Sequence, residues 1–282
     1  MKKTKKQKEE AAVIEVPKGI SSGWYYVIRY IAIIAMLADH LGKVLYSTGH
    51  LSYDHLIFCN MFGRMAFPLF AFELVECYFH TKDWKNHLGK LGLLAFISEI
   101  PFDMAMVHET PLKFSLSAFD CQNTCLTLFF GFLYMKITDI KWNNVLGKLY
   151  KSKALKKFGT FAIKLLIFAL FVVLTAEVGC DYTWRGMTLI ALFHFARKRK
   201  FTKIFQLMAV TTFVILMGTS VMIYMTVFFT LIPIYLAECK KKMVHNEKLE
   251  KILTSKVSTK ISTFFYPAHL VILTIIKAIL MA

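Results

Sequence analysis

Long apolar runs alternate with short polar segments along almost the whole chain. Several runs reach about 17–25 residues, the length that an α-helix needs to cross a hydrocarbon core of roughly 30 Å. Read with the turn signals between them, they predict an all-α, polytopic integral membrane helical bundle of about nine transmembrane helices, in a range of about 8–10. The break at Gly218-Thr219-Ser220 is either a hairpin or a kink. The predicted spans are 24–45, 56–80, 88–108, 123–137, 158–178, 183–197, 203–218, 220–238 and 261–281.

The composition and the placement of charge agree with that pattern. Hydrophobic residues make up 56% of the 282 residues, and the formal net charge is +17. The basic residues concentrate in alternate connections, which the positive-inside rule explains with the N-terminus in the cytoplasm and the C-terminus outside. No nucleic-acid-binding module accompanies the charge. We expect residues 1–22 to form a disordered basic cytoplasmic arm, and residues 23–282 to form one transmembrane domain in the cell (plasma or inner) membrane.

Ionisable residues also occur inside the apolar runs, where each costs on the order of 2.5–3.5 kcal/mol at a helix centre. His40, Arg64, Glu99 and Asp103 are the main examples. With the predicted topology these residues lie in the outer half of their spans, together with Asn123 and the Asp181 turn. We therefore expect one buried polar pocket formed by several helices.

Six blocks follow one another along the chain: MLADHLGKVL, FGRMAFPLFAFELVECYFHTKD, LLAFISEIPFDMAM, QNTCLTLFFGFLYM, DYTWRG and FFYPAHLVILTII. In this order they resemble the TraX family. The name-giving member of that family acetylates the N-terminus of a conjugative pilin, so the resemblance implies an acetyl-CoA-dependent membrane acyltransferase. The chain departs from the usual family pattern at Cys77 and Thr183, where glycine is common.

Acyl transfer from a thioester needs a base for the acceptor proton, donors for the oxyanion, and cationic contacts for the acyl donor. His40 is the first candidate for the base, because imidazole titrates near neutral pH. A structural histidine that is hydrogen-bonded to another helix is the alternative. Asp39 is poorly placed to orient the His40 ring, and we expect it to pair with Arg64, which is also a candidate contact for the coenzyme.

The next three candidates lie around the start of the fourth span. Glu99 and Asp103, four residues apart, share a helix face and orient the catalytic histidine, bind the acceptor amine, or act as counter-ions for Arg64. Asn123 supplies an oxyanion donor or caps the span.

Two further groups complete the candidate site. Asp181, Tyr182 and Arg185 either shape an acceptor entrance or form a polar interfacial loop. Tyr266 and His269 lie deeper, because His269 is only about 14 Å along its span. They meet the thioester end of the coenzyme, or His269 replaces His40 as the base.

The sequence thus predicts transfer of acetyl from cytoplasmic acetyl-CoA to an amine or hydroxyl of a peptide or glycan, without a metal. The expected partners are the lipid bilayer, acyl-CoA and that acceptor, and not nucleic acid. The alternatives are a proton-coupled small-molecule transporter and a non-catalytic membrane assembly protein. A disulfide between Cys121 and Cys180 is possible in this topology.

Overall fold

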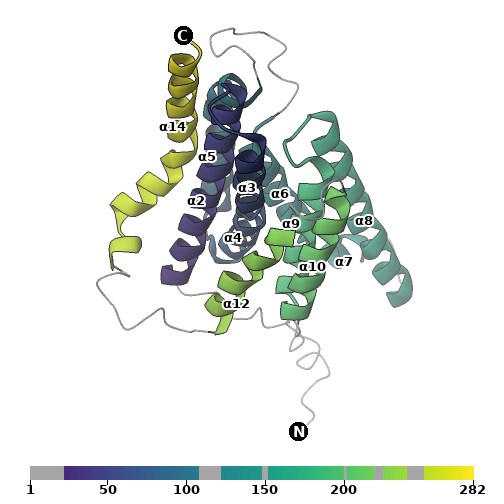
Figure 1. Cartoon of the computed structure of the whole chain (residues 1–282). Coiled ribbons are helices and arrows are strands. Elements are labelled where there is room, and N and C mark those ends of the chain that lie inside the picture. Colours follow the sequence, from purple (N-terminus) through teal and green to yellow (C-terminus); the bar gives the residue numbers. More distant parts are fainter. Residues whose placement is uncertain (1–21, 108–121, 148–151, 200–201, 219–224, 240–250) are drawn as a thin grey trace.

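A computed structural model describes residues 22–107, 122–147, 152–199, 202–218, 225–239 and 251–282. The predicted N-terminal arm (except Ser22), Cys121 and most of the lysine-rich 240–260 connection lie outside these ranges. Within the described part the chain is almost entirely helical (Figure 1). The elements are α2 (Ser22–Ser47), α3 (Tyr53–Gly63), α4 (Ala66–His80), α5 (Trp84–Phe102), η1 (Asp103–Val107), α6 (Thr124–Thr138), α7 (Trp142–Leu146), α8 (Lys153–Glu177), α9 (Thr183–Arg197), α10 (Thr202–Met217), η3 (Thr226–Thr230), α12 (Leu231–Cys239) and α14 (Lys256–Leu280).

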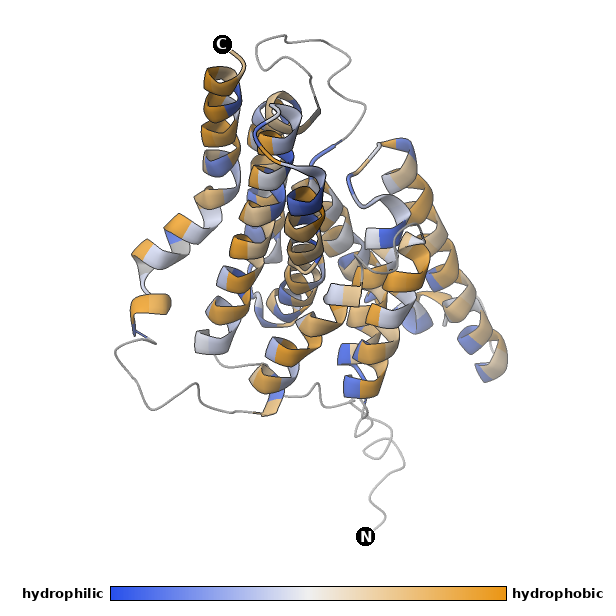
Figure 2. Cartoon of the chain, in the orientation of Figure 1, coloured by the Kyte–Doolittle hydropathy of each residue, from blue (hydrophilic) through white to orange (hydrophobic). Residues whose placement is uncertain are grey.

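The helices are those of a membrane protein. Three described segments are long and apolar enough to cross a bilayer: Tyr53–His80, Lys153–Glu177 and Lys260–Leu280. α6, α10 and the η3–α12 segment are apolar but shorter. Large side chains such as Phe96 (80% exposed) and Phe158 (73%) face outward, where lipid rather than water suits them. Hydrophobic positions predominate along most of the helices (Figure 2). Each of the nine predicted spans overlaps a helix, while the number that cross the membrane stays a prediction.

The second predicted span is interrupted where Arg64 occurs. α3 ends at Gly63 and α4 begins at Ala66, so Arg64 and Met65 form a turn inside an otherwise continuous apolar segment. The turn lies directly against α2, since a Cβ added to Gly63 would stand 2.2 Å from Cβ of Asp39. Only glycine permits this approach of backbone to side chain.

α10 and α12 form a hairpin, which answers the question left open at Gly218. Near the start of α10, Gln206 donates a hydrogen bond to Glu238 at the end of α12 (2.7 Å). In the same region, the Tyr235 hydroxyl donates to the Lys203 carbonyl (2.7 Å). These contacts join the first turns of one helix to the last turns of the other, so the two helices are antiparallel.

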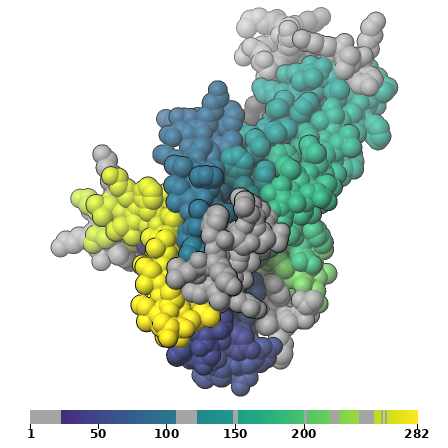
Figure 3. Space-filling model, turned by 90° about the horizontal axis from the view of Figure 1, so that it is seen from above, coloured from purple at the N-terminus to yellow at the C-terminus, as the bar shows by residue number. Residues whose placement is uncertain are grey.

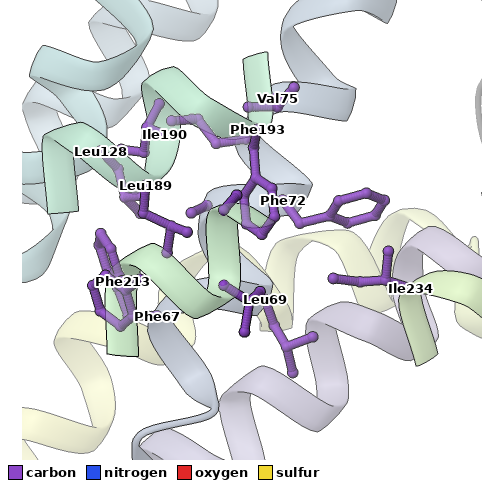
Figure 4. Close-up of a cluster of buried hydrophobic side chains, with 14 of the residues drawn as sticks. Phe67, Leu69, Phe72, Val75, Leu128, Leu189, Ile190, Phe193, Phe213 and Ile234 are labelled. Carbon is purple, nitrogen blue, oxygen red and sulfur yellow. The ribbon is translucent and has the colours of Figure 1, made fainter. Parts of the chain in front are cut away.

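The larger hydrophobic core lies on one side of α4. It joins α4 to α6, α9, α10 and α12 through fully buried side chains that include Phe67, Phe72, Phe193 and Phe213 (Figure 4). A second core of smaller residues, among them Ala35, Ala95 and Leu270, joins α2 to α5 and α14. Seen from the end where the C-terminus lies, α14 (yellow) lies against segments from the first third of the chain (Figure 3).

Ion pairs connect α4 to both sides of the bundle. Glu73 pairs with Arg29 of α2, and Glu76 pairs with Arg197 of α9. All four side chains are largely buried, so each charge is neutralised within the protein.

Candidate functional site

Two histidines from opposite ends of the chain meet between the helices. His40 lies about 27 Å along α2 from Ser22, and its Nδ1 is 2.9 Å from Nε2 of His269 on α14. The two rings are nearly parallel, with an interplanar angle of 9°. The residues are 7% and 3% exposed, respectively.

This contact corrects the expected depth of His269. Counting from Lys260 placed His269 well below His40, but the two side chains lie at one level. α14 begins at Lys256, more than a turn before the predicted span, and it contains Pro267. Proline bends a helix, and α14 is visibly bent (Figure 1).

A small cavity of about 60 Å³ opens beside His40. Charged and aromatic side chains supply much of its wall, and five of the predicted site residues are among them. Near the cavity, Thr124 donates a hydrogen bond to Asp181 (2.7 Å), and Tyr182 stacks on Phe67 with ring centroids 3.9 Å apart. The polar and aromatic residues that line the small cavity include Asp39, His40, Lys43, Arg64, Thr124, Asp181 and Tyr182.

A second, larger cavity has a volume of about 390 Å³. Its charged residues Arg29, Glu73 and Lys90 lie toward the end of the bundle where α2 begins and α4 ends. The opposite part reaches Tyr266 and Phe265, the residues just before His269 in α14. Met36, Phe70 and Thr124 line both cavities, so the two spaces adjoin.

Three predicted site residues have structural contacts away from both cavities. Asn123 caps α6 by accepting from the Cys125 amide (2.9 Å), and its own amide group donates to the Ala95 carbonyl (2.7 Å) and to Glu99. The bond to the Cys125 amide confirms that Asn123 caps α6, one of its two expected roles. Glu99 holds Asn123, and Asp103 is buried where α5 passes into η1 after Pro101.

Asp39 has a different partner from the one expected, and Arg185 lies apart from the cavities. Asp39 forms its ion pair with Lys43, one turn further along α2 (2.6 Å), and the expected partner Arg64 lines the same cavity. Arg185 lies over the Trp184 ring, 5.4 Å from its centroid, and does not line either cavity.

Sequence reasoning missed Lys43, Arg29 and Glu73 as polar groups of the two cavities. Arg29 lies within the apolar run WYYVIRYIAIIAM. The signal that selected His40, a charge inside an oily helix, was therefore present there too.

A pair of buried histidines, one of which lines the smaller of two adjoining cavities within a helical bundle, defines the candidate site of a membrane protein. The chain belongs to the TraX family, because the family model described as TraX protein matches residues 25–277. Among curated proteins it is similar to the probable fimbrial assembly protein FimC, serogroup H1, of Dichelobacter nodosus. The two are 27% identical over 191 residues, which are 65% of this chain and 67% of that protein. No solved structure matches the chain.

Proposed function

We propose that the protein is a membrane acyltransferase that moves acetyl from acetyl-CoA to an amine or hydroxyl of a peptide or glycan. The observation that carries the proposal is the position of His40, which lines the small cavity close to where that cavity adjoins the large one. Separate spaces for donor and acceptor that adjoin near a buried imidazole suit direct transfer between two bound substrates.

The chemistry assigns one substrate to each cavity. The acetyl-CoA thioester lies at the inner end of the large cavity, near Tyr266, and Lys90 lies toward the anionic part of the coenzyme. The acceptor enters the small cavity. The nitrogen or oxygen of the acceptor attacks the thioester carbonyl while His40 removes the proton from that atom. The coenzyme then leaves as a thiolate, which takes the proton from His40. Arg64 and Lys43 supply positive charge near the developing oxyanion.

The orientation follows from the basic connections. One end of the bundle is the end where α4 and α9 finish and α5 begins, and it carries Lys82, Lys85 and Lys198. The large cavity is nearest that end. We infer that this end is cytoplasmic, in a multi-pass protein of the cell membrane, so that acetyl-CoA enters from the side where it is made. A single cysteine at Lys85 should react with an impermeant maleimide only from the cytoplasmic face, and labelling from outside would contradict the orientation.

The test is acetyl transfer by the purified protein in nanodiscs. The assay supplies radiolabelled acetyl-CoA with a peptide that has a free N-terminus, the same peptide already acetylated, or a glycan. We expect label on one acceptor, and about a 10²–10⁴-fold loss in His40→Ala. His55→Ala, in the exposed first turns of α3, is the matched control and should retain activity. Full activity of His40→Ala would refute the role of His40.

A non-catalytic assembly function is the second candidate, and the similarity to a probable fimbrial assembly protein favours it. In that case the buried pairs, such as Glu76 with Arg197, serve only to hold the helices. Absence of thioester cleavage with every acceptor, in protein that is folded and still supports fimbrial assembly in cells, would favour this function. Solute flux in proteoliposomes without thioester cleavage would favour the transporter instead.

A further inference from the structure

The backbone determines which nitrogen of His269 carries its proton. Nδ1 of His269 lies 2.9 Å from the carbonyl oxygen of Phe265, one turn earlier in α14. A carbonyl oxygen only accepts hydrogen bonds, so Nδ1 must be the donor. In neutral His269 the other nitrogen, Nε2, then has a lone pair and no proton.

The tautomer of His269 in turn determines the tautomer of His40. Since Nε2 of His269 is an acceptor, Nδ1 of His40 must carry the proton in the 2.9 Å hydrogen bond between them. His40 therefore keeps its lone pair on Nε2, the nitrogen that is left for the small cavity, which His40 lines. Phe265 stacks on the His269 ring at 7° and 5.1 Å, and this contact holds the orienting ring in place.

We propose that His269 is a positioning residue for His40, and that the chain from the Phe265 carbonyl through His269 to His40 fixes the tautomer with an unprotonated Nε2. This inference rests on the proposed function and refines it: His40 accepts the proton, and His269 neither removes the proton nor contacts the coenzyme. The orienting group of a catalytic histidine is often a carboxylate. Here Asp39 is paired with Lys43, and a second imidazole takes that role.

The arrangement also serves the step after proton removal. When Nε2 of His40 takes the acceptor proton, Nδ1–H of the resulting imidazolium still points at the lone pair of neutral His269. The hydrogen bond becomes charge-assisted and stronger without any movement of either ring. The proton then leaves Nε2 for the departing thiolate, and both histidines return to their starting tautomers.

Two substitutions separate positioning from other roles of His269. The amide of glutamine lies near the position of histidine Nε2, so His269→Gln can present its oxygen to Nδ1–H of His40. The shorter asparagine places its amide near the position of Nδ1 and does not reach His40. We expect His269→Gln to keep kcat within a few-fold of wild type, and His269→Asn to lose about 10² or more. KM for acetyl-CoA should stay unchanged in both variants.

Each other pattern of activity overturns the proposal. Equal loss in the glutamine and asparagine variants, as large as in His40→Ala, would make His269 the base. Full activity in both would remove any role in positioning. A raised KM for acetyl-CoA would assign His269 to the coenzyme. An inactive wild-type protein would refute the proposed function instead, and the next measurement then decides on the tautomer alone.

Nitrogen-15 NMR of histidine-labelled protein in nanodiscs reports the tautomers directly. The chain has nine histidines. The signals of His40 and His269 are assigned by their absence from the spectra of His40→Ala and His269→Gln, respectively. For both His40 and His269 we expect a protonated Nδ1 and an unprotonated Nε2. In His269→Asn the His40 signals should shift to a mixture of tautomers, while His55→Ala should leave them unchanged. A protonated Nε2 on His269 in the wild-type protein would overturn the proposal without any activity assay.

Discussion

Asp139, the residue just after α6, shows how much of this bundle depends on single polar side chains. It accepts hydrogen bonds from Tyr78 (3.0 Å) and His194 (3.1 Å), and it pairs with Lys198. Burial alone would raise the pKa of the Asp139 carboxyl, but the hydrogen bond from His194 and the pairing with Lys198 outweigh it and hold the pKa well below the usual range. One carboxylate thus joins α4, α6 and α9.

Asp139→Asn should lower the stability of the protein, because it removes the charge opposite Lys198. We expect a loss of about 1–3 kcal/mol, measured as a lower midpoint of thermal unfolding in detergent at pH 7. Glu177→Gln, the same chemical change at the exposed end of α8, should have little effect. A midpoint for Asp139→Asn equal to that of Glu177→Gln would contradict this role.

The difference in stability between wild type and Asp139→Asn should depend on pH in a definite direction. The pKa of Asp139 is lower in the folded state than the unfolded value of about 3.9, so the carboxylate stabilises the fold above that value. The stabilisation is lost as the pH falls through the lower, folded pKa. The difference between wild type and Asp139→Asn should therefore be full at pH 6–7 and shrink below about pH 4.

The sequence predicted which residues are unusual better than it predicted their partners. A charge inside an oily segment is visible without coordinates, and His40, Arg64 and Asp181 do line one cavity. The partners depend on helix rotation and on side-chain reach, which a periodic pattern does not determine. Lys198 was therefore counted only as loop charge, and Asp39 was expected to pair with Arg64.

At the scale of whole elements, the sequence correctly predicted a helix in each apolar run but did not predict where helices are interrupted. Each predicted span overlaps a helix because a long apolar run has few other ways to satisfy its backbone in a membrane. The turn at Arg64 and the π-helix after Pro101 break that regularity at particular residues. Such breaks depend on contacts between helices, such as that of Gly63 with Asp39, and a single sequence does not reveal those contacts.

Gly63→Ala tests the close contact between α2 and the α3–α4 turn. A Cβ at Gly63 would stand 2.2 Å from Cβ of Asp39, so the helices must separate, at a cost of about 1–3 kcal/mol. Because Arg64 is the next residue, acetyl transfer should fall as well. Thermal unfolding and the transfer assay measure the two effects.

Gly89→Ala is the matched control, on the exposed face of α5. An added Cβ there meets nothing within 4 Å. Alanine is the better helix former by about 1 kcal/mol, so this variant should be as stable as wild type or more stable, with unchanged activity. Equal behaviour of the two alanine variants would show that the contact at Gly63 is not tight.

At the scale of the whole molecule, the bundle contains two cavities that follow one another. They adjoin where Met36, Phe70 and Thr124 line both. This arrangement depends on α14, which comes from the end of the sequence but packs against α2 and α5 (Figure 3). No local pattern in the sequence reveals such a cavity, because its walls come from segments more than 200 residues apart.

If the cavities hold different substrates, filling one should affect one substrate only. Leu91 of α5 lines the large cavity, so Leu91→Trp should raise KM for acetyl-CoA by about tenfold, which corresponds to roughly 1.4 kcal/mol of lost binding. KM for the acceptor should stay unchanged, because the small cavity is left intact. Leu93→Trp, two residues along the same helix and 58% exposed, is the control and should leave both constants unchanged. A rise in the acceptor KM alone in Leu91→Trp would mean that the two cavities hold the substrates the other way round.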